Sequence, residues 1–413
     1  MYSDTSGYKV LEGNETFLVK ILWERLNPSE WPLRIDDFPP GSFLVGGAIR
    51  DGLIGKLKEK PDLDFVVHSD ARNLARNLAI KNGGTFIELD AERDIARWVC
   101  GDWTIDIASQ IGVSVEDDLC RRDFTLNSIA LSLDKQLKIL DPMNGIKDLR
   151  NKTLTTKKEQ NLVDDPLRLL RALRFQAEFD FKIEKNTREW IKYHRSKLFN
   201  AAPERIQAEL MKLVCGKWAE KGIQAIWDYK LLDLWLCRPK DSEKLTQNLS
   251  NAKNFTPQEI SMALPLSRLT TLLNDEGLEN LRFSRKQKKD CTLLRKWISR
   301  YDGLAFQTLS ESDRLQLHKD LEKTLPAIIL ILSPSEQIEW LRRWRNKNDS
   351  LFHPASPIDG LVLQNTFGLL EGPKLGRLLD HLSHERAFGR LHNKEKVFTA
   401  ARLWLQQNVP RCD

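Results

Sequence analysis

The chain has 413 residues, which at about 150 residues per domain indicates two or three domains. Hydrophobic residues make up 41% and charged residues 30%, as in globular chains rather than disordered ones. No apolar run is long enough to span a bilayer, the first residues lack a signal-peptide pattern, and the six scattered cysteines form no CxxC pair. We therefore expect a cytoplasmic protein with no membrane segment, disulfide framework or thiolate zinc site.

The net charge of +6 is distributed unevenly along the chain. Residues 1–150 contain 19 Lys and Arg against 25 Asp and Glu, whereas the remainder contains 45 against 33. Carboxylates in the first part could hold divalent metal ions, and the basic part could hold a polyanion. Ordinary solvated surface explains the same counts, so charge alone leaves both interpretations open.

Secondary structure is predicted from the apolar pattern in chain order. A helix with Asn14 as its cap comes first, and a Pro-rich linker ends at about residue 40. Between Phe43 and Leu133 the pattern is mixed α/β, with helices expected after Gly47 and over residues 71–80. Five short segments bounded by Gly or Asp predict strands: FLVGG, LDFVV, GTFIEL, ARWVC and WTIDIA. From about residue 164 helical periodicity dominates, and no strand is expected.

The segment LVGGAIRD (44–51) predicts a strand, a glycine turn and the start of a helix. Glycines such as Gly46 and Gly47 let a phosphate approach the backbone, where the helix start offers free N–H groups. Arg50 lies on the first turn of this helix and could reach the same anion. The segment therefore predicts a phosphate-binding turn.

Asp62 and Asp64 flank Leu63 on an expected strand, so the period of two places both carboxylates on one face. Neighbouring carboxylates repel each other unless a cation lies between them, and a pair of Mg²⁺ ions can bridge an attacking hydroxyl and a leaving phosphate. Asp106 is a third candidate on a separate strand. A lone Asp-x-Asp is also found at ordinary strand ends, but the glycine turn before it favours the metal interpretation.

The segment RRDFTLN (121–127) combines a basic pair with polar groups. Arg122 suits a triphosphate, and Asp123 and Asn127 could hydrogen-bond a ribose. The next segment that combines carboxylates with arginines in this way begins at Asp164.

Pro166 fits the first turn of a helix that Asp164 or Asp165 would cap. Four charged side chains recur there every three residues, on one gradually rotating face: Asp165, Arg168, Arg171 and Arg174. A salt-bridged surface helix is the alternative. The segment ERIQAE (204–209) begins another helix, which we interpret as a brace around these arginines.

Basic clusters at RFSRKQKK (282–289) and RRWRNK (342–347) could hold the phosphate backbone of a folded RNA by its shape. The segment GLLEGPKLGR (368–377) adds cations where a helix starts. The candidate RNA contacts are Arg282, Arg285, Lys286, Lys374 and Arg377. Solvated surface is the alternative for each cluster.

Taken in order and spacing, LVGGAIRD…DLD, RRDFTLNSIA, DPMNGIKDL, DDPLRLLRALRF and ERIQAEL resemble the five motifs of class II tRNA nucleotidyltransferases, the bacterial CCA-adding enzymes and their poly(A) polymerase relatives. The resemblance covers about residues 43–213. It implies an α+β fold with a polymerase-β-like nucleotidyltransferase head followed by an all-α neck, body and tail. The expected boundaries are 1–40 for an N-terminal helix and linker, 41–140 for the head, 141–215 for the neck, 216–335 for the body and 336–413 for the tail.

The resemblance also implies roles for individual residues. Asp62 and Asp64 would hold the two Mg²⁺ ions, and Asp106 falls at the place of the family's third carboxylate. Asp165 and Arg168 would form a protein template for the incoming base, accepting from the exocyclic amine of C or A. U and G present a carbonyl there, and a buried clash of acceptors costs about 1–3 kcal/mol. The nucleotide, mainly its triphosphate, would be bound by Gly47, Arg50, Arg122 and Arg171.

The implied activity is template-free addition of CCA to the 3′ end of tRNA, with CTP and ATP as substrates. Enzymes that add all of CCA carry a long loop rich in charged residues and Tyr before the RRD motif, and the segment IASQIGVSVEDDLCR here has none. Its loss marks the CC-adding branch, which leaves the terminal A to a separate enzyme. We favour CC addition, with complete CCA addition and A addition or polyadenylation as open alternatives. The three carboxylates and both template residues argue against a non-catalytic RNA-binding protein.

Overall fold

The structure is a computed structural model that describes residues 8, 10–233, 235, 252–301 and 303–408. The chain divides into two compact units. The first comprises Met1–Glu209 with Gln224–Leu234, and the second comprises Leu210–Ile223 with Trp235–Asp413. The division into five parts stays a prediction.

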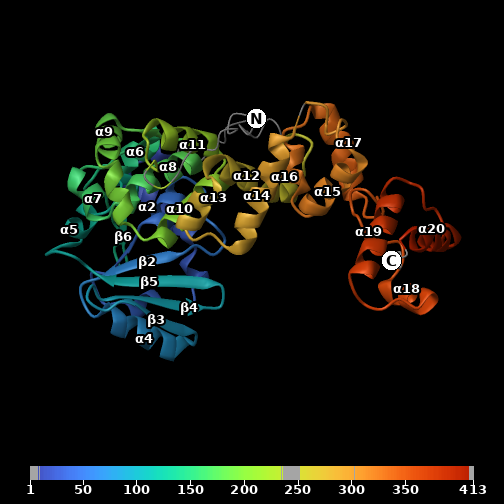
Figure 1. Cartoon of the computed structure of the whole chain (residues 1–413). Helices are drawn as coiled ribbons and strands as arrows, with labels where there is room; N and C mark the ends of the chain where they lie inside the picture. Colours follow the sequence, from blue (N-terminus) through green and yellow to red (C-terminus); the bar gives the residue numbers. More distant parts are fainter. Residues whose placement is uncertain (1–7, 9, 234, 236–251, 302, 409–413) are drawn as a thin grey trace. The chain divides into compact units, whose positions relative to one another are not determined.

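The first unit contains a seven-stranded sheet with the order β3-β4-β5-β2-β1-β6-β7 (Figure 1). Its pairs are antiparallel except for β2 and β5, which run parallel. The five strands expected from the sequence are confirmed, and two short strands follow them. The strands are β1 (Phe43–Val45), β2 (Leu63–Val67), β3 (Thr85–Asp90), β4 (Ile95–Cys100), β5 (Trp103–Ser109), β6 (Ala130–Ser132) and β7 (Ile139–Leu140).

Alternation along β5 separates its two faces. Trp103, Ile105 and Ile107 are buried, whereas Thr104 and Asp106 between them are only partly buried. Helix α4 (Ala71–Asn82) connects β2 to β3 and packs on β3, β4 and β5 (Figure 1). The other face of the central strands is therefore left for polar side chains.

The N-terminal helix α2 (Glu15–Leu26) is capped as expected, because the side chain of Asn14 accepts a hydrogen bond from Phe17 N at 2.9 Å. It packs against α3 (Gly47–Leu53), the helix expected after the glycine turn. Leu18, Leu22 and Leu26 form the buried stripe of α2.

Helices follow the sheet within the first unit. They are α5 (Val115–Cys120), α6 (Gly145–Asn151), α7 (Glu159–Asp164), α8 (Leu167–Phe179), α9 (Lys185–Tyr193), α10 (Pro203–Cys215) and α11 (Ala219–Asp228). Helix α10 ends in the second unit, and α11 begins in it. The expectation of no strand after about residue 164 was wrong, since β9 (Lys182–Ile183) pairs in parallel with β8 (Thr153–Leu154). Two residues are too few to leave a period-two pattern in the sequence.

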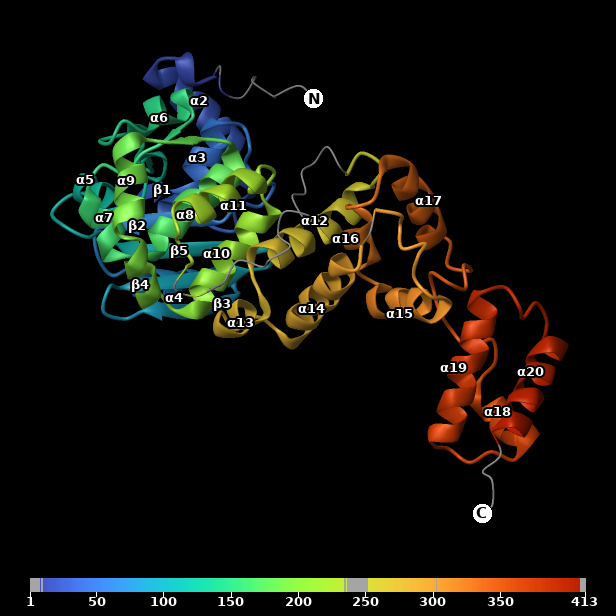
Figure 2. The same cartoon turned by 45° about the horizontal axis from the view of Figure 1, so that its top comes forward.

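The described part of the second unit is helical and has two hydrophobic clusters. The first cluster includes Leu264, Trp297, Phe306 and Phe352. Its helices are α12 (Pro257–Leu272), α14 (Arg285–Ser299), α15 (Glu311–Leu321), α16 (Leu325–Ile329) and α17 (Pro334–Arg345), and α13 (Asp275–Asn280) packs against α14. The second cluster is smaller and joins the three helices shown in red tones in Figure 2, which are α18 (Gly360–Phe367), α19 (Pro373–Ala387) and α20 (Lys394–Gln407).

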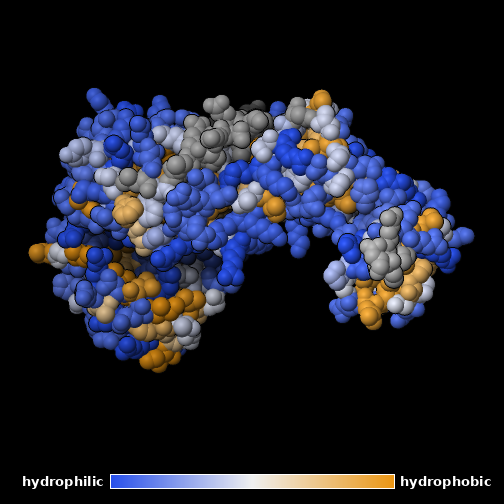
Figure 3. Space-filling model, in the orientation of Figure 1, coloured by the Kyte–Doolittle hydropathy of each residue, from blue (hydrophilic) through white to orange (hydrophobic). Residues whose placement is uncertain are grey.

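Five short 3-10 helices complete the described elements: Val10–Glu12, Pro28–Glu30, Ile35–Asp37, Thr125–Asn127 and Arg195–Asn200. No helix among the described residues has the length and hydropathy needed to cross a bilayer. The surface in Figure 3 is mainly hydrophilic, with apolar patches over the β3–α4 end of the sheet, where Ile80, Ile87 and Leu89 are exposed.

Candidate active site

Three charged side chains form a row across the open face of the sheet. Asp64 of β2 lies opposite Asp106 of β5, which in turn lies opposite Arg97 of β4. Directly paired residues on neighbouring strands point to the same side, so the three side chains are neighbours. Asp62, one residue before β2, is exposed and close enough to act on the charge of Asp64. The structure thus brings the three predicted carboxylates together.

The carboxylate of Asp64 has a raised pKa. Its pKa is raised to about 6, mainly by burial: the negative charges of Asp106 and Asp62 add to the shift, and the positive charges of Arg122 and Arg97 oppose it. A divalent cation at this position would relieve the repulsion and favour the ionised form. The carboxylate oxygens are also the ligand type that Mg²⁺ prefers, so the residues fit that ion.

Gly46 brings the glycine turn against this carboxylate. It has φ = 76° and precedes α3 as the N-cap. A Cβ atom there would lie 3.1 Å from Oδ2 of Asp64 and 3.6 Å from Nη1 of Arg122. A side chain would be strained and would crowd the carboxylate, which explains the requirement for glycine. Gly47 begins α3 directly beside it.

Four predicted nucleotide-binding residues form one connected network. Arg50 donates from Nη1 to Oδ1 of Asn127 (2.7 Å), whose Nδ2 donates to Oδ1 of Asp123 (2.9 Å). Arg171 Nη2 lies 2.9 Å from Oδ2 of Asp123. Burial favours the protonated form of Asp123, but the charge of Arg171 and the hydrogen bond from Asn127 outweigh it and hold the pKa of Asp123 below its usual range.

Arg50 is buried in this network rather than open to an anion. Its Nε and Nη2 donate to Asp51, and the guanidinium stacks on the rings of Phe175 and Phe179 at 5.1 and 4.8 Å. All three guanidinium nitrogens therefore have protein partners. Its role in binding nucleotide stays a prediction, and its observed contacts connect α3 to the segment after the RRD motif and to α8.

The predicted template residues lie at the junction of α7 and α8. Asp165 accepts from Leu167 N through Oδ1 (3.2 Å) and from Arg205 through Oδ2 (2.9 Å). Arg168 donates from Nη1 to the carbonyl oxygens of Arg121 (3.0 Å) and Asn161 (2.8 Å). Both side chains are therefore held in one orientation by protein contacts.

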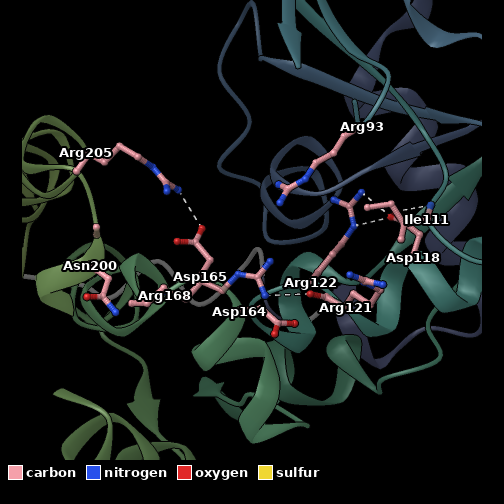
Figure 4. Close-up of a pocket in the computed structure, with 13 residues that line it drawn as sticks. Arg93, Ile111, Asp118, Arg121, Arg122, Asp164, Asp165, Arg168, Asn200 and Arg205 are labelled. Atoms are coloured by element: carbon pink, nitrogen blue, oxygen red, sulfur yellow. Dashed lines mark hydrogen bonds and ion pairs between the residues drawn. The ribbon is translucent and has the colours of Figure 1, made fainter. Parts of the chain in front are cut away.

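A cavity of about 600 Å³ opens beside these two residues. Figure 4 shows Arg93 and Arg205 reaching it from different elements, with Asp165 and Arg168 on its floor. Arg122, the remaining predicted residue in its wall, has Nη1 beside the glycine turn and donates from Nε and Nη2 to Asp118 (3.3 and 3.0 Å). Arg122 therefore connects the cavity to the carboxylate row, and the volume suits a nucleotide.

Three arginines of the cavity wall, Arg93, Arg121 and Arg205, were not assigned to a ligand from the sequence. Arg93 lies between β3 and β4, where no sequence pattern marked it. Arg205 belongs to the segment predicted to brace the arginines of α8, and its ion pair with Asp165 fits that interpretation, as does the 2.8 Å pair between Arg174 and Glu209. Because Arg205 is 40 residues from Asp165 along the chain, no local sequence pattern could indicate their contact.

The candidate RNA contacts lie in the second unit. Arg282, Arg285, Lys286 and Arg377 are exposed, and Lys374 is partly buried. The other basic cluster, at 342–347, is largely occupied by internal ion pairs, because Arg342, Arg343 and Arg345 each hold a carboxylate. It is therefore a weaker candidate than the cluster at the start of α14.

Family models and known proteins match the chain in the same regions. A model described as "Poly A polymerase head domain" matches residues 42–111 and 107–155, and "Probable RNA and SrmB- binding site of polymerase A" matches 180–239. Among solved structures, a CCA-adding enzyme with CTP is similar with a TM-score of 0.72 at 21% identity, covering 95% of this chain and 99% of that one. A Thermotoga maritima CCA-adding enzyme with tRNA has a TM-score of 0.67 at 21% identity, covering 98% and 99%. These likenesses show the fold.

Curated relatives extend the match to nearly the whole chain. A CC-adding tRNA nucleotidyltransferase of Synechocystis is 30% identical over 400 residues, which are 90% of this chain and 95% of the relative. A CCA-adding enzyme of Ligilactobacillus salivarius is 27% identical over 89% and 94%, and an A-adding enzyme of Deinococcus radiodurans is 38% identical over 51% and 48%. The chain therefore belongs to the class II tRNA nucleotidyltransferase family and is a nucleotidyltransferase enzyme.

Proposed function

We propose that this nucleotidyltransferase adds the two cytidines of the CCA end to tRNA from CTP and leaves the terminal adenosine to a separate A-adding enzyme. The observation that carries the proposal is the connection between β5 and α5, which has five residues, 110–114. The CC-adding relative of Synechocystis, similar over nearly its full length, supports the same assignment. CCA-adding and A-adding relatives keep complete CCA addition and A addition as the alternatives.

The short connection is held by hydrogen bonds along most of its length. Gln110 N donates to Val67 O (2.8 Å), and Ile111 N donates to Oδ1 of Asp118 (3.3 Å). The backbone N–H groups of Val113 and Ser114 both donate to Oδ2 of Asp117 (3.1 and 3.2 Å). Ile111 of this connection lines the cavity. Because the hydrogen bonds restrain the connection, we expect the pocket to keep the size that fits cytosine and not to change shape to accept adenine.

Base selection would come from Asp165 and Arg168. A carboxylate oxygen accepts from the N4 amine of cytosine, and a guanidinium N–H donates to the adjacent N3. Among the described residues, Nε and Nη2 of Arg168 have no hydrogen-bond partner, which leaves donors for the base. Uracil would place its O4 against the carboxylate, and the resulting contact between acceptors would exclude UTP.

The reaction would join the 3′ hydroxyl of the tRNA to the α-phosphate of CTP in line and release pyrophosphate. Asp62 and Asp64 would hold Mg²⁺, which when bound supplies charge neutralisation at the phosphates. Arg122 would place a second positive charge between the base site and the carboxylate row. Asp106 would act in catalysis as the third carboxylate of the row. The residues thus act by orientation and charge rather than by covalent chemistry.

The acceptor RNA would be held in the second unit by its phosphate backbone. The proposed contacts are Arg282, Arg285, Lys286, Lys374 and Arg377. Because tRNA and CTP are substrates of the cytoplasm, we place the enzyme there.

A tail-addition assay tests the proposal. The protein and Mg²⁺ are mixed with tRNA transcripts ending before CCA, after one C and after CC, each with CTP, ATP or both, and the 3′ ends are sequenced. Addition that stops after the second C, with no extension of the CC transcript by ATP, is the expected result. A complete CCA end, or addition of A alone, would overturn CC specificity, and Asp62→Ala serves as the inactive control.

A further inference from the structure

Arg97 binds the third carboxylate of the row with both arms of its guanidinium. Nε donates to Oδ1 of Asp106 at 2.7 Å, and Nη2 donates to Oδ2 at 2.8 Å. A bidentate pair of this geometry is stronger than a single charged hydrogen bond, and it uses one lone pair on each carboxylate oxygen. Asp106 is therefore engaged by a protein cation.

The other two carboxylates have no such partner. Among the described residues, neither Asp62 nor Asp64 is joined to a hydrogen-bond donor or to an arginine or lysine by an ion pair. The same part of the chain contains no group of three His, Cys, Asp or Glu side chains arranged to hold a metal ion. The row is thus divided into two open carboxylates and one that Arg97 occupies.

A metal ion and Arg97 would compete for Asp106. Both are cations that bind the same oxygens, so a metal ion at Asp106 would have to share these oxygens with the guanidinium or displace it, and would in either case lie beside a positive charge. The pair is 39% and 25% exposed at its two side chains, so it can open without disturbing the sheet. Mg²⁺ is commonly held by one or two carboxylates plus substrate phosphates, which is what the open pair offers.

We propose that Arg97 is a positioning residue that withholds Asp106 from the metal ion until substrate is bound, so that Asp62 and Asp64 alone hold the metal in the free enzyme. The phosphate oxygens of the nucleotide would then add to the ligands of the metal. The inference rests on the proposed metal site at Asp62 and Asp64. It extends that proposal, because Asp64 of β2 would hold the metal ion whereas Arg97 of β4 would keep Asp106 away from it.

The test compares the Mn²⁺ affinity of the wild type, two single variants and their double variant. Mn²⁺ is titrated into protein without nucleotide or RNA, and free Mn²⁺ is measured by electron paramagnetic resonance. Asp106→Asn should change the affinity less than about twofold, because the carboxylate is already engaged. Arg97→Gln should tighten binding about tenfold, the usual size of an outer-shell effect on a metal site. The double variant should return to the wild-type affinity, since Arg97 acts through Asp106.

Arg72→Gln is the matched control, because Arg72 of the same unit also bridges carboxylates, Glu88 and Asp94, outside the row. It removes the same charge and should leave Mn²⁺ affinity unchanged. The proposal is overturned if Asp106→Asn alone weakens binding tenfold, or if Arg97→Gln and Arg72→Gln tighten it equally.

Two further readouts separate the possible failures. If no variant binds Mn²⁺, or Asp62→Asn has no effect on binding, the metal site and the role of Arg97 fail together. If the cycle holds but the tail-addition assay gives a complete CCA end, only the CC specificity is lost. In activity assays Arg97→Gln should lower the Mg²⁺ concentration at half-maximal rate, whereas a purely structural role would lower kcat without that shift.

Discussion

Replacing Asp165 with Asn should relax the choice between cytosine and uracil while leaving the chemistry in place. The carboxylate is oriented by two donors, Leu167 N at Oδ1 (3.2 Å) and Arg205 at Oδ2 (2.9 Å). Asn has the same shape, but its amide nitrogen can donate to O4 of uracil where the carboxylate can only accept. Removing a buried contact between two acceptors is worth about 1–3 kcal/mol.

That free energy corresponds to about a 5- to 150-fold change in the ratio of kcat/KM for CTP to kcat/KM for UTP. Single-addition kinetics with each nucleotide measure the ratio. Asp164→Asn is the matched control, because the neighbouring carboxylate accepts from Gln160 (2.7 Å) and is not assigned to the base. A ratio that stays at the wild-type value in Asp165→Asn, or that changes equally in both variants, refutes the template assignment.

Three more outcomes are expected. Asp62→Ala should abolish nucleotide transfer but leave tRNA affinity within about twofold in a filter-binding assay, because the charge of one exposed carboxylate is screened by salt. A parallel loss of tRNA binding would contradict the role of Asp62 in holding the metal ion. The pKa of Asp64 is raised to about 6, mainly by burial, so Mn²⁺ binding should weaken as pH falls below that value. A calorimetric titration should then show release of about one proton per ion at pH 5 and none at pH 8. A constant affinity between pH 5 and 7 would contradict this expectation. Arg285→Gln should reduce the slope of log tRNA affinity against log salt concentration by about one unit. Lys288→Gln should change this slope less, because Lys288 is paired with Glu279. Equal changes in the two variants would assign the effect to net charge and not to a contact of Arg285.

Five strands of the sheet and the main helices were predictable because their signals are local, whereas the short strands β6 and β7 were not predicted. The LDFVV segment alternates and is bounded by Asp, and it is strand β2 without a shifted residue. Asn14 caps the first helix as its side chain and position required. The two-residue strand β9 escaped prediction because pairing with β8 rather than residue pattern defines it.

The electrostatic partners of the site could not be read from the sequence. Arg50 is typical of a phosphate ligand in its motif, yet its guanidinium bonds to Asn127, 77 residues away, and lies among aromatic rings. Asp165 is paired with Arg205, 40 residues away. These contacts depend on which helix packs beside which, and spacing along the chain carries no information about that.

The sequence by itself determined the family, the order of strands and helices, and the residue types of the site, because turn chemistry and apolar periodicity are properties of neighbouring residues. The tertiary structure alone decided which carboxylates are open. Asp64 and Asp106 are equivalent in pattern, but the register of β5 against β4 places Arg97 at hydrogen-bond distance from Asp106. The register results from the packing of the whole sheet, so the charge state of the site is a tertiary property.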